Sequence, residues 1–325
     1  MNLAIRLADT RTREVYPLPV DRPANWYAGP EPNTWCADVA LPAVPAEHIV
    51  VPSYMQLPAC ESHYFEFCNG ETRSKLQRVP GDVEPASRAQ THVVAGKEAV
   101  VSTHIDCWHT LRDTGAGTIT VVVQAALRPR AYLLVVGLRP LDLAPKPPLS
   151  GGNVILPLPA TISQMQADAS IAQRICSPTA LQMAMTRFAQ SPTWEDTIAA
   201  CFDPISNAYG SWPMAIHWAS AQGIVAAVEV FNRWEDVLVL LQQQIPLVCS
   251  IRFAQGQLQD APLTQSQGHL VLLYGVQDNE VLVKDPAGED HGSVERRYPL
   301  AQFISAWLSR RGAGYVLAAQ PARGI

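Results

Sequence analysis

Hydrophobic and polar positions follow a strand-like pattern in the first half of the chain. Runs rich in Val, Ile, Thr and Leu are separated by turns with Gly or Pro, and helical periodicity is nearly absent. Eighteen of the 27 prolines lie before residue 160. The expected strands are Ala99–Trp108, Thr118–Leu127 and Ala131–Leu141, with shorter ones at Trp35–Leu41, His48–Val51 and His63–Cys68. This pattern predicts an antiparallel β-sandwich-like accessory domain over residues 1–148.

A proline-rich and glycine-rich segment follows the last of these strands. Pro145, Pro147 and Pro148 stiffen it, and the pair Gly151-Gly152 then loosens it. The sequence therefore predicts a linker over residues 149–159.

After residue 160, helical and strand patterns alternate. Helices are expected from Cys176, at 193–202, from Ser211 to Gly223, at 234–244 and at 300–310. Strands are expected at 224–231, 245–253, 268–276, 280–286, 294–298 and 314–319. Helices come first and a mostly antiparallel sheet follows, which predicts an α+β domain over residues 160–325.

Composition and charge exclude several classes of protein. The chain has 48% hydrophobic residues, a formal net charge of −5 and no run of Lys or Arg, so nucleic-acid binding is not expected. No segment has the apolar length of a signal peptide or a membrane span. The seven cysteines are odd in number and scattered, which favours a reducing compartment over a disulfide framework. We therefore expect a cytoplasmic protein without a membrane partner.

Two groups of possible metal ligands occur in the first half. Cys60, His63 and Cys68 do not match a familiar zinc spacing. His104 and His109 would face opposite sides of one continuous strand. Ordinary packing is the preferred interpretation of both groups, and we expect neither a metal nor a cofactor.

Cys176 stands directly before the pattern of an amphipathic helix. Pro178 suits the first helical turn, and apolar residues recur at helical spacing after it. A thiol at a helix N-terminus is biased toward the thiolate, which is the nucleophilic form. A small core residue is the plainer interpretation of a single cysteine, so partners are needed.

His269 and Asp285 are the partners that the sequence offers. His269 opens one strand, Asp285 closes the next, and the hairpin-like turn between them lies near Gln277. Folding the hairpin brings an imidazole and a carboxylate to neighbouring strands, at about 5 Å. A base and its orienting group are what a cysteine nucleophile requires. The rival bases, His217 and His291, lie on a predicted helix and in a polar loop.

Residues 155–321 resemble the papain-fold cysteine peptidases of the bacteriocin-processing, double-glycine peptidase-like family. The motifs that carry the resemblance are SQM (163–165), ICSPTALQM (175–183), SWP (211–213), IPLVCSIRF (245–253), GHLVLLYG (268–275) and VKDPA (283–287). The resemblance implies that Cys176 is the nucleophile, His269 the general base and acid, and Asp285 the group that orients the imidazole. It also implies an oxyanion-hole glutamine upstream of the cysteine.

The position of that glutamine departs from the family pattern. The residue six before Cys176, where papain-like enzymes often keep it, is Ser170. Gln164, Gln166 and Gln173 are the candidates. Gln173 would need a tight turn just before Cys176, so Gln164 is preferred, and the choice between the two stays open. No transporter or secretion segment accompanies the motifs, so leader processing during export is not expected.

These features predict a cysteine peptidase or amidohydrolase that cleaves a peptide or amide bond through an acyl-enzyme. An acyltransferase or transglutaminase-like enzyme with the same triad is one alternative. A catalytically silent binding module is the other.

Overall fold

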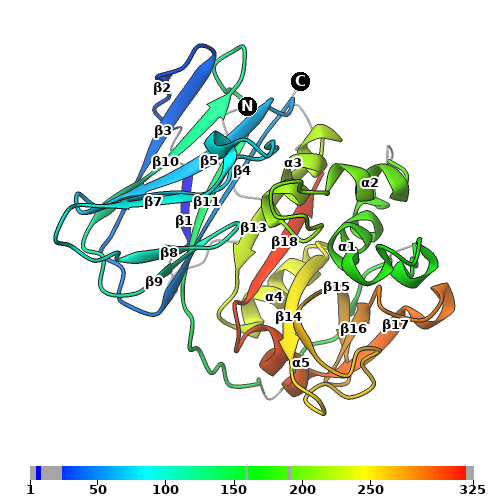
Figure 1. The fold of residues 1–325 in the computed structure, drawn as a ribbon. Helices are drawn as coiled ribbons and strands as arrows, with labels where there is room; N and C mark the ends of the chain where they lie inside the picture. The colour runs from blue at the N-terminus through cyan, green and yellow to red at the C-terminus, as the bar shows by residue number, and fades with distance from the viewer. Residues whose placement is uncertain (1–4, 9–23, 149, 158–159, 189–191, 320–325) are drawn as a thin grey trace.

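The computed structural model describes residues 5–8, 24–148, 150–157, 160–188 and 192–319 (Figure 1). Among the described residues before 141, the regular elements are strands and one short 3-10 helix, and helices join strands after residue 160. The change in pattern along the sequence is therefore also a change in architecture.

Two sheets form a sandwich in the first half. The five-stranded sheet has the order β1 (Ile5–Ala8), β11 (Tyr132–Pro140), β4 (His48–Gln56), β9 (Trp108–Thr110) and β8 (Val101–Thr103). The six-stranded sheet has the order β2 (Tyr27–Ala28), β3 (Thr34–Leu41), β10 (Gly117–Gln124), β5 (Ser62–Cys68), β6 (Thr72–Lys75) and β7 (Gln90–Val93). Buried side chains from both sheets, among them Phe67, Trp108 and Val121, form one core. All pairs are antiparallel except β1 with β11, so the predicted sandwich is confirmed.

The prediction of a single continuous strand at Ala99–Trp108 is wrong. The chain reverses after β8 and returns as β9, and the backbone N–H of His104 donates to the carbonyl of Cys107 across the turn, at 2.9 Å. Because of this reversal, the rings of His104 and His109 lie with centroids 3.9 Å apart. The prediction that these two side chains face opposite ways is therefore also wrong.

The second half is built on a seven-stranded antiparallel sheet. Its order is β13 (Val225–Val230), β18 (Ala313–Ala318), β14 (Leu247–Phe253), β15 (Ser266–Gln277), β16 (Glu280–Lys284) and β17 (Glu295–Pro299). The short β12 (Val154–Ile155), inside the segment predicted as a linker, pairs with β15. The helices are α1 (Cys176–Met185), α2 (Trp194–Ala200), α3 (Trp212–Ala221), α4 (Trp234–Gln242) and α5 (Leu300–Trp307). The predicted α+β fold is confirmed.

The helix starts follow the expected signals with one difference. Thr193 caps α2, because its hydroxyl accepts a hydrogen bond from the Asp196 N–H at 3.1 Å. Ser211 occupies the N-cap position of α3, with Pro213 in the first turn, but its side chain makes no capping bond. Gly223 follows α3 at a φ of +76°, a conformation that glycine adopts without strain.

Strands β4 and β11 of the sandwich lie beside β13 of the α+β unit (Figure 1), and side chains from both units join one core cluster. Along β4 and β11, successive side chains alternate between the two cores: Val50 and Leu134 face the sandwich interior, and Ile49, Val51 and Val135 join the core that continues into α3 and β13. Across this boundary, the backbone N–H of Val228 donates to Ser53 Oγ at 2.9 Å. The five-stranded sheet is therefore buried on both faces at these strands.

No helix in the described part of the chain is long and apolar enough to cross a lipid bilayer.

Candidate active site

The hairpin of β15 and β16 forms as the sequence predicts. Asp278 and Asn279 make its two-residue turn, both with positive φ, and Gln277 pairs with Glu280. A bulge between Leu273 and Gly275 shifts the register, so that Leu272 faces Lys284. This register places Asp285 close to His269 across the pair.

His269 and Asp285 form a buried hydrogen-bonded pair. His269 Nε2 lies 2.7 Å from Asp285 Oδ1, and their relative exposures are 2% and 1%. Burial would raise the pKa of the Asp285 carboxyl, but the charge and hydrogen bond of His269, the Tyr298 hydroxyl and the Ala287 N–H together hold it below its ordinary value. Burial would likewise lower the pKa of His269, but Asp285 raises it.

Tyr298 is a member of the site that the sequence reasoning missed. It lies on β17, and its hydroxyl donates to Asp285 Oδ2 at 2.7 Å. Asp285 Oδ1 also accepts from the Ala287 N–H at 2.9 Å. Both carboxylate oxygens are thus fixed. The strand containing Tyr298 was predicted, but nothing in the one-dimensional pattern marks a tyrosine as an orienting group.

Cys176 is the first residue of α1, and the ring of His269 acts on the pKa of its thiol. Because His269 Nε2 is held by Asp285, Nδ1 is the ring nitrogen left for the thiol. Burial would raise the pKa of the thiol, but the hydrogen bond and charge of His269 outweigh it and leave the pKa below its ordinary value. The structure therefore brings together the cysteine, histidine and aspartate named from sequence.

Gln164 lies beside this group, on the 3-10 helix η2 (Gln164–Gln166). Its backbone N–H donates to the carbonyl of Pro286 at 2.8 Å, next to Asp285. Its side-chain Nε2 donates to the carbonyl of Ala172 at 2.7 Å, four residues before Cys176. The amide is buried and its nitrogen carries a second hydrogen.

Gln173 is also close to the site, on the 3-10 helix η3 (Ala172–Arg174). It lines the same cleft as Cys176. The tight turn that argued against Gln173 is present, because η3 leads directly into α1. Ser170 is held in an exposed turn, where its hydroxyl donates to Asp168 Oδ1 at 2.6 Å.

The two rival histidines have other surroundings. The ring of His217, on α3, faces His63 of the sandwich with a centroid separation of 6.2 Å. His291 Nδ1 accepts the backbone N–H of Ser163 at 3.0 Å.

Cys176 opens into a cleft of about 390 Å³ whose walls come from both halves of the chain. The turn between β8 and β9 contributes His104, Ile105 and Asp106. The other charged lining residues are four arginines: Arg174, Arg252, Arg310 and Arg311. Within the described residues, none of these arginines forms an ion pair with a carboxylate. Asp106, the one acidic residue of the lining, is almost fully buried.

Comparison with known proteins places this half of the chain in a family. Residues 160–315 match the model of the family described as Peptidase_C39 like family. Over this segment, which is just under half of the chain, the sequence is similar to that family. The C39-like domain is thus a cysteine peptidase domain, as the motifs around Cys176 and His269 indicated.

Solved structures also resemble the C39-like half of the chain. One is a double glycine motif protease from an AMS/PCAT transporter in complex with the leader peptide; it has 12% identity and a TM-score of 0.35, and the match covers 51% of this chain and 95% of that one. Another, from Bacillus anthracis, is described as a C39-like peptidase; it has 16% identity and a TM-score of 0.40, and the match covers 52% of this chain and 98% of that one. No curated protein sequence matches the chain.

Proposed function

We propose that this protein cleaves a peptide bond with Cys176 as nucleophile, His269 as general base and acid, and Asp285 as the orienting group. The observation that carries the proposal is the buried, hydrogen-bonded His269–Asp285 pair together with Cys176 at the start of α1. The raised pKa of the imidazole and the lowered pKa of the thiol both favour a thiolate–imidazolium pair at neutral pH.

In this mechanism, the Cys176 thiolate attacks the carbonyl carbon of the scissile bond, and the carbonyl oxygen becomes an oxyanion. The backbone N–H of Cys176, at the start of α1, and the side-chain amide of Gln164 stabilise that oxyanion. The His269 imidazolium gives its proton to the departing amine, and the carbon–nitrogen bond breaks. Water, deprotonated by His269, then attacks the thioester and releases the acid and the thiolate.

Asp285 acts through His269 and does not contact the substrate. Its carboxylate holds the Nε2–H of His269 and so directs Nδ1 toward Cys176. Tyr298 and the Ala287 N–H hold the carboxylate in turn, so the ring has one orientation.

The cleft favours a substrate that carries acidic groups near the cleaved bond. Four arginine side chains face one nearly buried carboxylate in the lining. Desolvation and the like charges of Arg311 and Arg310 lower the pKa of Arg252, which is what crowding of unpaired cations produces. A peptide carboxylate in the cleft would relieve this repulsion and form charge-assisted hydrogen bonds with guanidinium groups.

We further propose the division into an accessory sandwich (1–148), a linker (149–159) and a peptidase domain (160–325). The accessory domain supplies the β8–β9 turn as one wall of the cleft, so it takes part in substrate binding. The seven cysteines are all free, which supports a reducing, cytoplasmic location.

A peptidyl electrophile tests the proposed function. Intact-mass and peptide-level mass spectrometry should find one adduct per chain, on Cys176, and none in Cys176→Ala. Incubation of an acidic peptide with and without added amine separates hydrolysis from acyl transfer. An adduct that persists in Cys176→Ala would overturn the assignment of the nucleophile.

A further inference from the structure

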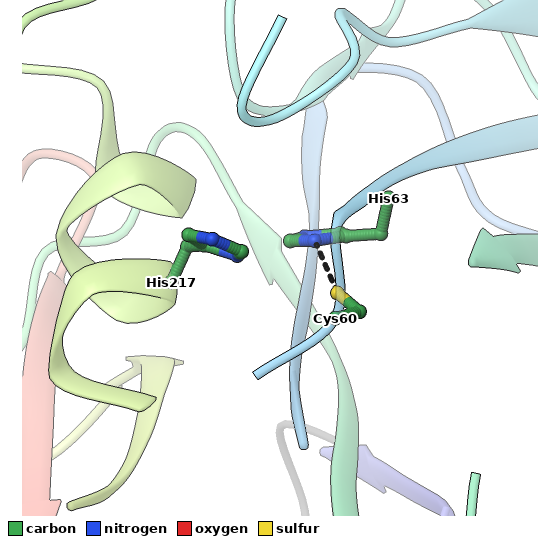
Figure 2. Close-up of side chains that lie close together, drawn as sticks. All are labelled: Cys60, His63 and His217. Carbon is green, nitrogen blue, oxygen red and sulfur yellow. Dashed lines mark hydrogen bonds between the residues drawn. The ribbon is translucent and has the colours of Figure 1, made fainter. Parts of the chain in front are cut away.

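A second cluster of reactive side chains lies where the sandwich meets α3, and the proposed peptidase chemistry does not use it (Figure 2). Cys60 lies in the loop before β5, His63 is the second residue of β5, and His217 is in the middle of α3. Two halves of the chain that are more than 150 residues apart in sequence therefore contribute to one cluster.

The three side chains point toward a common centre. The sulfur of Cys60 lies 3.9 Å from Nδ1 of His63, and the His63 and His217 rings face each other across the domain boundary (Figure 2). One potential ligand atom from each residue lies within 4.8 Å of the other two. A tetrahedral zinc ion with bonds of about 2.0–2.3 Å keeps its ligands about 3.3–3.6 Å apart. Small side-chain rotations that shorten the distances between the three ligand atoms by about 1 Å would therefore allow all three to bind one ion.

The surroundings of the cluster match those of a metal site. Cys60 and His63 are 7% and 2% exposed, and the rings of Tyr54 and Phe65 lie against His63 with centroids at 5.3 and 5.8 Å. Within the described residues, His63 Nε2 is buried without a hydrogen-bond partner, which is costly for an imidazole. This ring nitrogen is therefore open to a ligand that the described residues do not supply.

The ligand types point to zinc. One thiolate and two neutral imidazoles form a borderline-soft ligand set. Such a set binds zinc in preference to magnesium or calcium. The sequence grouped Cys68 with Cys60 and His63 as possible ligands, with ordinary packing preferred, whereas the structure brings His217 to the cluster.

We propose that Cys60, His63 and His217 bind one zinc ion, with water as the fourth ligand. On binding, the Cys60 thiol gives its proton to solvent and a sulfur–zinc bond forms, while each imidazole contributes a nitrogen lone pair. The site joins the sandwich to α3, whose first residue, Trp212, lines the cleft beside Cys176. The ion would thus stabilise the docking of the sandwich and take no part in the cleavage step.

Zinc binding to the full chain tests this proposal directly. The experiment uses the Cys176→Ser background, because the catalytic thiol also binds zinc. After chelator treatment and dialysis, calorimetry and metal analysis should find one zinc per chain, and the thermal midpoint should rise with zinc but not with magnesium. Cobalt substituted for zinc should give a thiolate-to-metal charge-transfer band.

Matched variants locate the ion. Cys60→Ser and His217→Gln should each lower zinc affinity at least ten-fold, and Cys60→Ser should abolish the cobalt band. Cys68→Ser, on the same strand, and His109→Gln, in the other histidine pair, should bind as the background does. If Cys60→Ser does not fold, His217→Gln decides the assignment, and it should still lower zinc affinity at least ten-fold. The proposal is overturned if the background protein binds no zinc. It is also overturned if Cys60→Ser and His217→Gln both still bind zinc, or if only His109→Gln loses it.

Discussion

At the scale of single residues, the geometry around Asp285 determines the orientation of His269. In Asp285→Ala the ring loses its hydrogen-bonded partner, so kcat/KM should fall about a hundred-fold or more, within the range expected for general acid–base catalysis. Asp285→Asn retains a hydrogen-bond acceptor and should keep more activity than the alanine variant. Steady-state kinetics, with circular dichroism as the folding control, measure both. Wild-type activity in Asp285→Ala would mean that the hairpin does not orient the base.

The side chain that donates a hydrogen bond to the oxyanion is the second prediction at the scale of single residues. Gln164→Ala should lower kcat about a hundred-fold, the usual effect of losing one such donor. Cys176 should remain alkylatable, since Gln164 does not generate the thiolate. Gln166→Ala, whose exposed side chain donates to the Glu289 carbonyl at 3.0 Å, is the matched control and should be unaffected. Full turnover in Gln164→Ala together with loss in Gln173→Ala would assign the role to Gln173.

At the scale of elements, the segment after α5 and the strand β14 carry the positive charge of the cleft. Arg311→Gln should raise KM several-fold for a peptide with acidic side chains and leave kcat nearly unchanged, because the charge binds the substrate and does not touch the reacting bond. Added salt should reduce the difference between variant and wild type. Arg297→Gln, on β17 and paired with Glu280, is the control. An equal change in KM for a neutral peptide would contradict a role for charge.

Most elements could be predicted from the sequence, because local signals mark them. Thr193 caps α2, and the Asp278-Asn279 turn places β15 beside β16. The β8–β9 hairpin was missed, because its turn has no Gly or Pro and its flanks are rich in β-branched residues. Tyr298 and the cleft arginines were also missed. Their proximity depends on the packing of elements far apart in sequence, which no periodicity reports.

At the scale of the whole molecule, the two halves are bound by a shared core. The nearly continuous apolar run of β11, Tyr132–Leu138, is a signal for a strand buried on both faces, and it could have indicated the contact from sequence. Gly151 likewise is not loose: its N–H donates to Asn279 Oδ1 at 3.0 Å, and its carbonyl accepts from Trp234 at 2.8 Å. The glycine pair is held against the peptidase sheet.

Arg139 is one of the polar links across this boundary. It lies on β11, is fully buried, and donates to Asn232 Oδ1 at 3.0 Å and to the carbonyls of Leu308 and Arg310. Arg139→Met should lower the free energy of unfolding by about 2–4 kcal/mol, because buried carbonyls lose their donors. It should also weaken substrate binding, since Arg310 and Arg311 lose their support.

Urea unfolding of the full chain measures the stability of Arg139→Met, with the exposed Arg130→Met as control. The shared core predicts that both halves unfold in one transition. Unchanged stability of Arg139→Met would show that the link between the halves is dispensable.

The central claim is that His269 converts Cys176 into a reactive thiolate, and the pH dependence of alkylation tests it most directly. Iodoacetamide should label Cys176 well before the other six cysteines and at a pH below the ordinary thiol value of about 8.5, because the imidazolium stabilises the thiolate. In His269→Ala this stabilisation is lost and burial remains, so the midpoint of the rate profile should move to 8.5 or above. Mass spectrometry of the labelled peptides gives the rate for each cysteine. A wild-type midpoint near 8.5 that His269→Ala leaves unchanged, or faster labelling of Cys36, Cys68 or Cys249, would contradict the account.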